Sequence, residues 1–425
     1  MKYILVIFYF LFFTLISVFS ETLPYDYELK LNVVYLEDKN LPTISNKDIR
    51  TILNEAESEL KIRFNANYIH FTYMGKRSLK SFFNKYLKRK SSFYKRLAPY
   101  KYRFFSGKIN YQPYREKIKK FLRQWKLLYL KEFFDKKVQE KIKTYDDVIE
   151  YLFKIYLSKL KKIERLRLSN GKYLINRRNN KFNSYINWLV AMHFQDLYDI
   201  IITTTIIIYD DISKPYPHAV LRYAKVGGSS FESPKRSLLD GTAAMVNLFE
   251  MLTDIKYFKQ PYHSRKINRM LWNKIIGRFI LAHEMGHMIY LIPDVYDHPR
   301  GCLMDSSFET MDYYEGYKLL EKYPFPCPKC APYVKAREMH LLADYLMKKK
   351  KYKDAIEKYK LARKMTPRKL DVPYDFYISL IYYKLAKAYL KLNDKNIAKF
   401  YIEKSLHQNP NNTKAKKLYN YIKRK

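Results

Sequence analysis

The feature that most constrains this 425-residue chain is the pentapeptide His283-Glu284-Met285-Gly286-His287. Histidines four residues apart on a helix project from one face, so both imidazoles can hold a single zinc ion. Glu284 stands beside them, where its carboxylate can take a proton from a water molecule on the zinc. The pattern therefore predicts a helix, a zinc site and a hydrolytic reaction.

The flanking sequence favours a helix here, because apolar residues recur upstream at helical spacing and no proline interrupts them before Pro293. These residues are Ile267, Leu271, Ile275, Phe279 and Ala282. A chance match, with two histidines on a buried face, is the alternative for so short a motif. Further ligand-type residues follow the helix, and they favour the zinc site.

The chain from His283 onward resembles the metzincin clan of zinc peptidases. Members carry HExxHxxGxxH, or an Asp as the last ligand, followed by a turn whose methionine packs beneath the metal. His283, Glu284 and His287 match this pattern, and Met304 fits the methionine. The resemblance implies a metalloendopeptidase of α+β fold in which Glu284 is the general base.

Two branches of the clan share further features with this chain. The run PDVYD at 293–297 is similar to the snapalysin and immune-inhibitor-A branch. Cys302-x-Met304 with the later CPKC is similar to archaemetzincins, which carry a second, cysteine-bound zinc.

The chain departs from the pattern where the third zinc ligand is expected. Tyr290 stands at the glycine position, and Pro293, which cannot bind metal, stands at the ligand position. Removing one residue before Asp294 would align Asp294 with the ligand position of the pattern. Asp294 is therefore the expected third ligand, and His298 is the second choice. In a gluzincin-like arrangement a glutamate on a later helix would complete the site, with Glu309 and Glu315 as candidates.

The three cysteines are Cys302, Cys327 and Cys330, and the last two have the spacing of a zinc knuckle. With either His298 or Asp297 they supply the four ligands of a closed structural zinc site. If His298 is the fourth ligand of this site, Asp294 is available as the third ligand of the catalytic zinc. A disulfide is the alternative in an exported protein, and it would leave one cysteine over.

The N-terminal residues predict export. Lys2 precedes an apolar run from Tyr3 to Phe19, and Val18 and Ser20 occupy the positions that a signal peptidase reads. Residues 1–20 are thus expected to be a signal peptide or a membrane anchor. The remainder is then secreted or extracytoplasmic.

Lysine and arginine outnumber aspartate and glutamate by 81 to 41, mostly evenly along the chain. One stretch, from Lys76 to Arg115, has thirteen basic and no acidic residues, with aromatics interleaved. It opens a basic, mostly helical insertion expected over 76–180. An anionic surface is the partner most compatible with export, whereas nucleic acid is not favoured, since no recognised motif is present. A helical core with solvated lysines is the alternative.

Residues 21–335 are expected to form the peptidase domain. Its opening is predicted as a strand at 28–37, a helix at 46–63 capped by Ser45, and a strand at 67–73. Within the insertion, Thr144 is predicted to cap another helix.

Two further strands are expected in this domain. The run from Ile200 to Ile208 predicts one continuous buried strand. Residues 219–226 predict an edge strand which, in the metzincin resemblance, would pair with an extended substrate.

Residues 336–425 resemble tetratricopeptide repeats. Leu342, Ala343, Ala355, Tyr359 and Pro367 mark one copy, and Leu385, Ala386, Ala398 and Pro410 mark a second. Partner binding and packing support are equally compatible with such a module. The function expected for the whole chain is zinc-dependent peptide hydrolysis. The alternative is a repeat-bearing interaction protein with a structural or inactive zinc domain.

Overall fold

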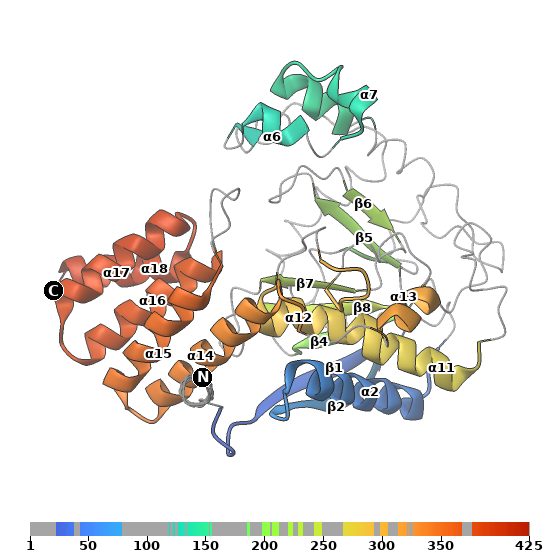
Figure 1. The fold of residues 1–425 in the computed structure, drawn as a ribbon, viewed down its shortest axis with the longest axis horizontal. Coiled ribbons are helices and arrows are strands. Elements are labelled where there is room, and N and C mark those ends of the chain that lie inside the picture. The colour runs from blue at the N-terminus through green and yellow to red at the C-terminus, as the bar shows by residue number, and fades with distance from the viewer. Residues whose placement is uncertain are drawn as a thin grey trace, which may run out of the picture. The chain divides into compact units, whose positions relative to one another are not determined.

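The computed structural model describes two compact units, and each is considered by itself (Figure 1). A mixed α/β unit covers residues 30–330, and a helical unit covers 331–367 and 376–424 together with 23–29. The described residues are 23–37, 43–78, parts of 119–154, 185–187, parts of 198–248, 267–292, 298–304, 313–320, 322, 326–367 and 376–424. The chain is therefore an α+β unit with a helical module, which agrees with the coarse fold class expected.

The α/β unit is built on a five-stranded sheet of order β2-β1-β4-β8-β7 (Figure 1). Its strands are β1 (Leu29–Glu37), β2 (Ile69–Ser78), β4 (Ile200–Thr203), β7 (Gly228–Glu232) and β8 (Thr242–Asn247). β4 runs parallel to both β1 and β8, and β7 runs antiparallel to β8. The central strand β4 consists wholly of buried β-branched residues, as is usual for a strand with parallel neighbours on both sides.

The predicted opening of this unit is confirmed. β1 and β2 flank α2 (Asn46–Phe64), and the Ser45 hydroxyl accepts a hydrogen bond from the backbone N–H of Asp48 at 3.0 Å. β2 extends five residues beyond the predicted strand end at residue 73. Local caps and alternation were thus sufficient to predict these elements.

The single strand predicted over residues 200–208 is wrong. β4 ends at Thr203, and β5 (Ile206–Asp211) belongs to a second sheet of order β3-β5-β6. The hydroxyl of buried Thr203 donates to the Leu36 carbonyl at 3.0 Å, so the first strand ends in a satisfied polar contact. An unbroken apolar run does not reveal such a division.

The strand predicted at 219–226 is present but shorter and in the second sheet. It is β6 (Val220–Tyr223), which pairs antiparallel with β5, while β3 (Tyr185–Asn187) pairs on the other side of β5. The next strand, β7, begins at Gly228.

The helix that carries the motif has three consecutive parts: α11 (Arg269–Lys274), η3 (Ile275–Leu281) and α12 (Ala282–Tyr290). η3 is a π-helix, where a continuous α-helix was expected. Such segments are rare and occur frequently at functional sites. A Cβ on Gly277 would lie 2.4 Å from the Ile52 carbonyl oxygen, so only glycine permits this approach to α2.

Asp48 joins the start of α2 to the start of α11. Its carboxylate accepts hydrogen bonds from Ser45 Oγ at 2.6 Å, Asn273 Nδ2 at 2.8 Å and Arg269 Nη2 at 3.2 Å. Burial acts to raise the pKa of Asp48, but these donors outweigh it and lower the pKa to about 2. The ionised carboxylate therefore holds the two helices together at neutral pH.

Little of the predicted insertion is described. α6 (Leu127–Lys131) and α7 (Lys136–Gln139) lie within it, and the predicted cap is confirmed, since Thr144 Oγ1 accepts from the Asp147 N–H at 3.2 Å. The basic stretch beyond residue 78 and the N-terminal apolar run lie outside the described residues. Among the helices that are described, none combines the length and apolar character needed to cross a bilayer.

Among its described residues, the helical unit has five helices in succession, each in contact with the next. They are α14 (Ala331–Lys348), α15 (Tyr352–Met365), α16 (Phe376–Lys391), α17 (Lys395–Gln408) and α18 (Thr413–Arg424). The turn after α14 has Lys350 at φ 60°, and the turn after α16 has Asn393 at φ 59°. These positions are 43 residues apart, the spacing that separates Pro367 from Pro410.

The hydrogen bonds of the two turns repeat with the same offset. Lys351 N–H donates to the Leu346 carbonyl at 2.9 Å, and Asp394 N–H donates to the Tyr389 carbonyl at 3.0 Å. Ala355 and Ala398, also 43 residues apart, are both fully buried. The module therefore contains two structurally equivalent helix–turn–helix units.

Glu338 on α14 should make stability depend on pH. Burial raises its pKa to about 7, which Lys335 only partly offsets. Because the unfolded chain ionises from about pH 4.5, stability falls as pH rises from there to about 7. We expect Glu338→Gln to stabilise the protein by roughly 2 kcal/mol more at pH 8 than at pH 4.5, as measured by thermal unfolding.

The matched control for this comparison is Glu357→Gln, which changes an exposed glutamate in the same unit. It should give no such pH-dependent gain. An equal effect of Glu338→Gln at both pH values would contradict the assignment.

Candidate metal centres

His283 and His287 lie on successive turns of α12, with their imidazoles pointing at each other. The two Nε2 atoms are 3.0 Å apart, and the ring planes are nearly perpendicular. Two nitrogens bound to one tetrahedral zinc would be separated by roughly 3.3 Å. The motif thus brings its two histidines together as its spacing predicts.

Backbone carbonyls fix the tautomers of both rings. His283 Nδ1 lies 2.6 Å from the Leu303 carbonyl oxygen, and His287 Nδ1 lies 2.6 Å from the Ile292 carbonyl oxygen. A carbonyl only accepts, so each Nδ1 must carry the proton and each neutral Nε2 a lone pair. Two lone pairs at 3.0 Å repel unless a proton or a metal ion lies between them. Carbonyl-oriented histidines of this kind are usual metal ligands.

Two other motif residues are positioned by packing. Glu284 is buried, with 5% of its surface exposed, and it adjoins His283 along α12. Met304, fully buried, packs directly on Gly286, where a Cβ would lie 2.2 Å from the methionine Sδ. The methionine therefore packs against the turn of helix that carries both histidines.

The end of α12 explains the departure at Tyr290. The Tyr290 ring stacks on Phe64 at 4.5 Å between centroids, and its hydroxyl hydrogen-bonds that of Tyr68 at 2.9 Å. Leu291 adopts the left-handed conformation at φ 55°, and the Ile292 N–H closes the turn on the Gly286 carbonyl. The chain thus turns one residue later than the glycine of HExxHxxG.

The candidates for the third ligand are only partly described. Asp294, Pro293, Asp297 and Glu309 lie outside the described residues. Glu315 lies on α13 (Tyr313–Leu320), which packs against η3. His298, the second choice for this role, belongs to a different centre.

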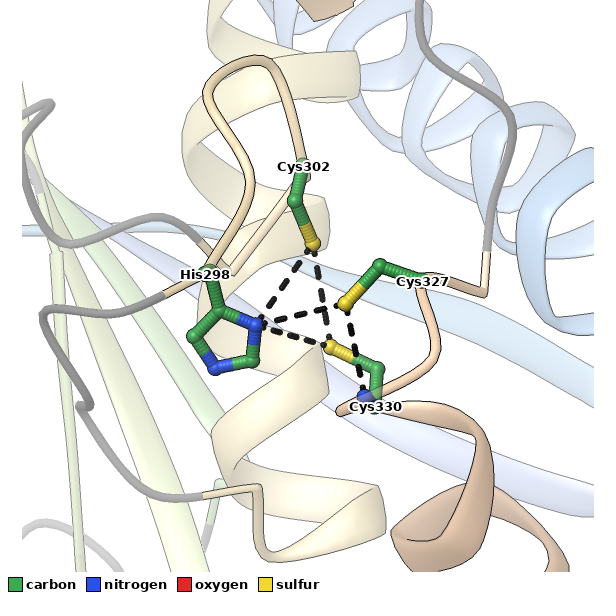
Figure 2. Close-up of side chains that lie close together, drawn as sticks. All are labelled: His298, Cys302, Cys327 and Cys330. Carbon is green, nitrogen blue, oxygen red and sulfur yellow. Dashed lines mark hydrogen bonds between the residues drawn. The ribbon is translucent and has the colours of Figure 1, made fainter.

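That second centre joins His298, Cys302, Cys327 and Cys330, all of them buried (Figure 2). One ligand atom of each lies within 4.8 Å of the others. Cys302 approaches from the loop that also carries His298, whereas the CPKC cysteines precede α14 (Figure 2). The three cysteines were predicted to group with either His298 or Asp297; in the described residues they group with His298, and the four could hold a metal ion.

The distances suit a tetrahedral ion. Cys302 Sγ and Cys330 Sγ are 3.7 Å apart, and His298 Nδ1 lies 3.4 to 3.8 Å from the three sulfurs. With usual zinc bond lengths, a tetrahedron has edges of roughly 3.8 Å between sulfurs and 3.5 Å between sulfur and nitrogen. All three cysteines are free, so the structure has no disulfide at this place.

Hydrogen bonds prepare the sulfurs for a cation. The Cys330 N–H points to Cys327 Sγ at 3.4 Å, as in a knuckle. The Cys330 thiol, by donating to Cys302, lowers the pKa of Cys302 to about 5, against the opposing effect of burial. The same pairing raises the pKa of Cys330, and burial raises the pKa of Cys327. Binding of a metal ion would thus release the remaining thiol protons.

Some contributors to these centres could not be recognised from sequence. Leu303 and Ile292 act through backbone carbonyls, for which side-chain identity gives no signal. Tyr68 and Phe64 hold the end of α12 from elements more than 200 residues earlier.

A comparison with models of known protein families gives no match for this chain, and no curated protein sequence matches it. The likeness to metzincins therefore rests on the motif residues themselves.

The packing of Met304 on Gly286 can be tested by a double-mutant cycle. Gly286→Ala should destabilise the protein by about 1 to 3 kcal/mol, because the added methyl has no space. With Met304→Ala already in place, the same substitution should have little cost, since alanine favours the helix. Urea unfolding of the four proteins measures the coupling. An equal cost in both backgrounds would show that the two side chains do not compete for one space.

Proposed function

We propose that this protein is a zinc-dependent peptidase whose catalytic zinc is held by His283 and His287. One observation carries the proposal. Both imidazoles donate through Nδ1–H to backbone carbonyls, and their Nε2 atoms face each other at 3.0 Å. Two lone pairs so placed need a shared proton or a metal ion between them, and a metal ion would use both as ligands. Borderline-soft zinc suits nitrogen ligands of this kind.

Glu284 gives the site its hydrolytic character. Zinc at this position would polarise a peptide carbonyl and lower the pKa of water. Glu284, next to His283 and buried, would accept the proton of the attacking water and deliver it to the leaving amine. A purely structural zinc site has no need of such a carboxylate.

The turn at Leu291 supports Asp294 as third ligand. In HExxHxxGxxH the last ligand follows the glycine turn by three residues. Here the left-handed residue is Leu291, and the third residue after it is Asp294. The one-residue offset that the sequence alignment required thus has a counterpart in where the helix ends.

β7 is the strand best suited to bind an extended peptide. In the part of the sheet that the structure describes, β7 forms an edge, and both β7 and β8 contact α12. A substrate could add to this edge through backbone hydrogen bonds. This replaces residues 219–226, which were expected in that role but lie in the second sheet.

The remaining roles follow from position and composition. Zinc at the cysteine centre would be structural, because four protein ligands leave no open position. Export, a protein partner at the repeat module and an anionic surface at the basic insertion remain part of the proposal.

The decisive test is cleavage of a mixed peptide library by the purified protein beside Glu284→Gln. The variant keeps the shape of the side chain but not its basicity. We expect kcat/KM to fall at least about a hundredfold while zinc content stays unchanged. A chelator should stop cleavage by the wild type. Absence of cleavage with zinc bound at the histidines would instead favour a repeat-bearing interaction protein.

The third ligand has its own test, since residues 293–297 hold two aspartates. Asp294→Asn should weaken zinc binding at the histidine site by at least tenfold, as loss of an anionic ligand requires. Asp297→Asn, three residues along, is the matched control and should leave the affinity unchanged. The reverse pattern, measured by zinc titration against a chelating dye, would move the ligand to Asp297 and leave the peptidase proposal in place.

A further inference from the structure

Three consecutive residues, Cys302, Leu303 and Met304, touch both metal centres. Cys302 Sγ is one corner of the cysteine centre, 3.7 Å from Cys330 Sγ. The Leu303 carbonyl accepts the Nδ1–H of His283 at 2.6 Å. The Met304 side chain fills the space on Gly286, the residue that precedes His287.

The segment is short and fully buried, so its parts cannot move independently. None of the three residues has exposed surface. The Met304 N–H donates a hydrogen bond to Cys302 Sγ. One hydrogen bond therefore ties the sulfur to the residue that supports α12. The Leu303 carbonyl follows Cys302 by one residue, so the sulfur and the carbonyl are carried by the same short, buried stretch of backbone.

The other side of the cysteine centre is independent of this segment in sequence. Cys327 and Cys330 come 23 or more residues after Met304, and they meet Cys302 only at the centre (Figure 2). In the described residues, the cysteine centre is therefore the junction that joins the CPKC turn to the loop that orients His283. An ion there would fix Cys302 Sγ at bond length from the metal.

We propose that Cys302–Met304 is a positioning segment, through which an ion in the cysteine centre strengthens metal binding at His283 and His287. This inference rests on the proposed function for its assignment of a metal to the histidines. Loss of a contact that orients a ligand histidine lowers metal affinity about 10- to 100-fold, which sets the expected size. Linkage requires the converse as well: a metal on the histidines strengthens the cysteine centre by the same factor.

The test uses the full chain and the variant Cys327→Ser/Cys330→Ser, which removes two ligands without touching residues 302–304. Cobalt(II) and zinc(II) are titrated into each protein. Thiolate-bound cobalt absorbs strongly through charge transfer, so the two centres are distinguished in one spectrum. The variant should bind cobalt at the histidines about 10- to 100-fold more weakly than the wild type.

Val34→Ala provides the matched control, because it makes a cavity in buried β1, a strand that contributes no residue to either centre. Its histidine site should keep the wild-type affinity, which separates positioning from general loss of stability. If the double-cysteine variant does not fold, an organomercurial applied to the wild type removes metal from the thiolates alone, and the same titration follows.

Each outcome decides the matter. Weaker histidine-site binding in the variant, with the control unchanged, supports the positioning segment. Equal affinity in variant and wild type overturns it and leaves the peptidase proposal standing. Wild-type protein that binds metal at the cysteines but never at the histidines overturns the proposed function, and this inference with it.

Discussion

Two hydrogen bonds to backbone carbonyls determine what the histidine pair can do. Each carbonyl accepts a hydrogen bond from one Nδ1–H, so both Nε2 lone pairs face the same point. Everything around α12 serves to keep those carbonyls in place. Met304 beneath Gly286 holds one of them, and the left-handed turn at Leu291 presents the other. Gly277 sets the helix against α2. The chemistry thus depends on backbone positions more than on side-chain identities.

Features determined by neighbours in sequence could be predicted. The Ser45 and Thr144 caps, the strand at β1 and the repeated helix pairs all depend on local hydrogen bonding or periodicity. The cysteine centre was also predictable, although its parts are distant, because three cysteines and one histidine leave few ways to complete a tetrahedron. The pairing of His283 with His287 follows from helical spacing alone.

The rest could not be predicted because its causes are tertiary. β4 and β5 share one apolar run, and only the partners available to each strand divide it between two sheets. The π-helical segment depends on the fit of Gly277 to α2. The Tyr290 ring is held by Phe64 and Tyr68, and the helix ends one residue after it. Periodicity carries no record of such contacts.

The cysteine centre also has a consequence for chain entropy. Cys302 and Cys327 are 25 residues apart, and an ion that binds both closes the chain between them into a loop. Closing a loop of this length restricts the unfolded chain by an amount equivalent to roughly 3 to 4 kcal/mol of stability. The ion would thus act as a reversible cross-link. Unlike a disulfide, such a cross-link forms and breaks with metal supply rather than with the redox state of the surroundings.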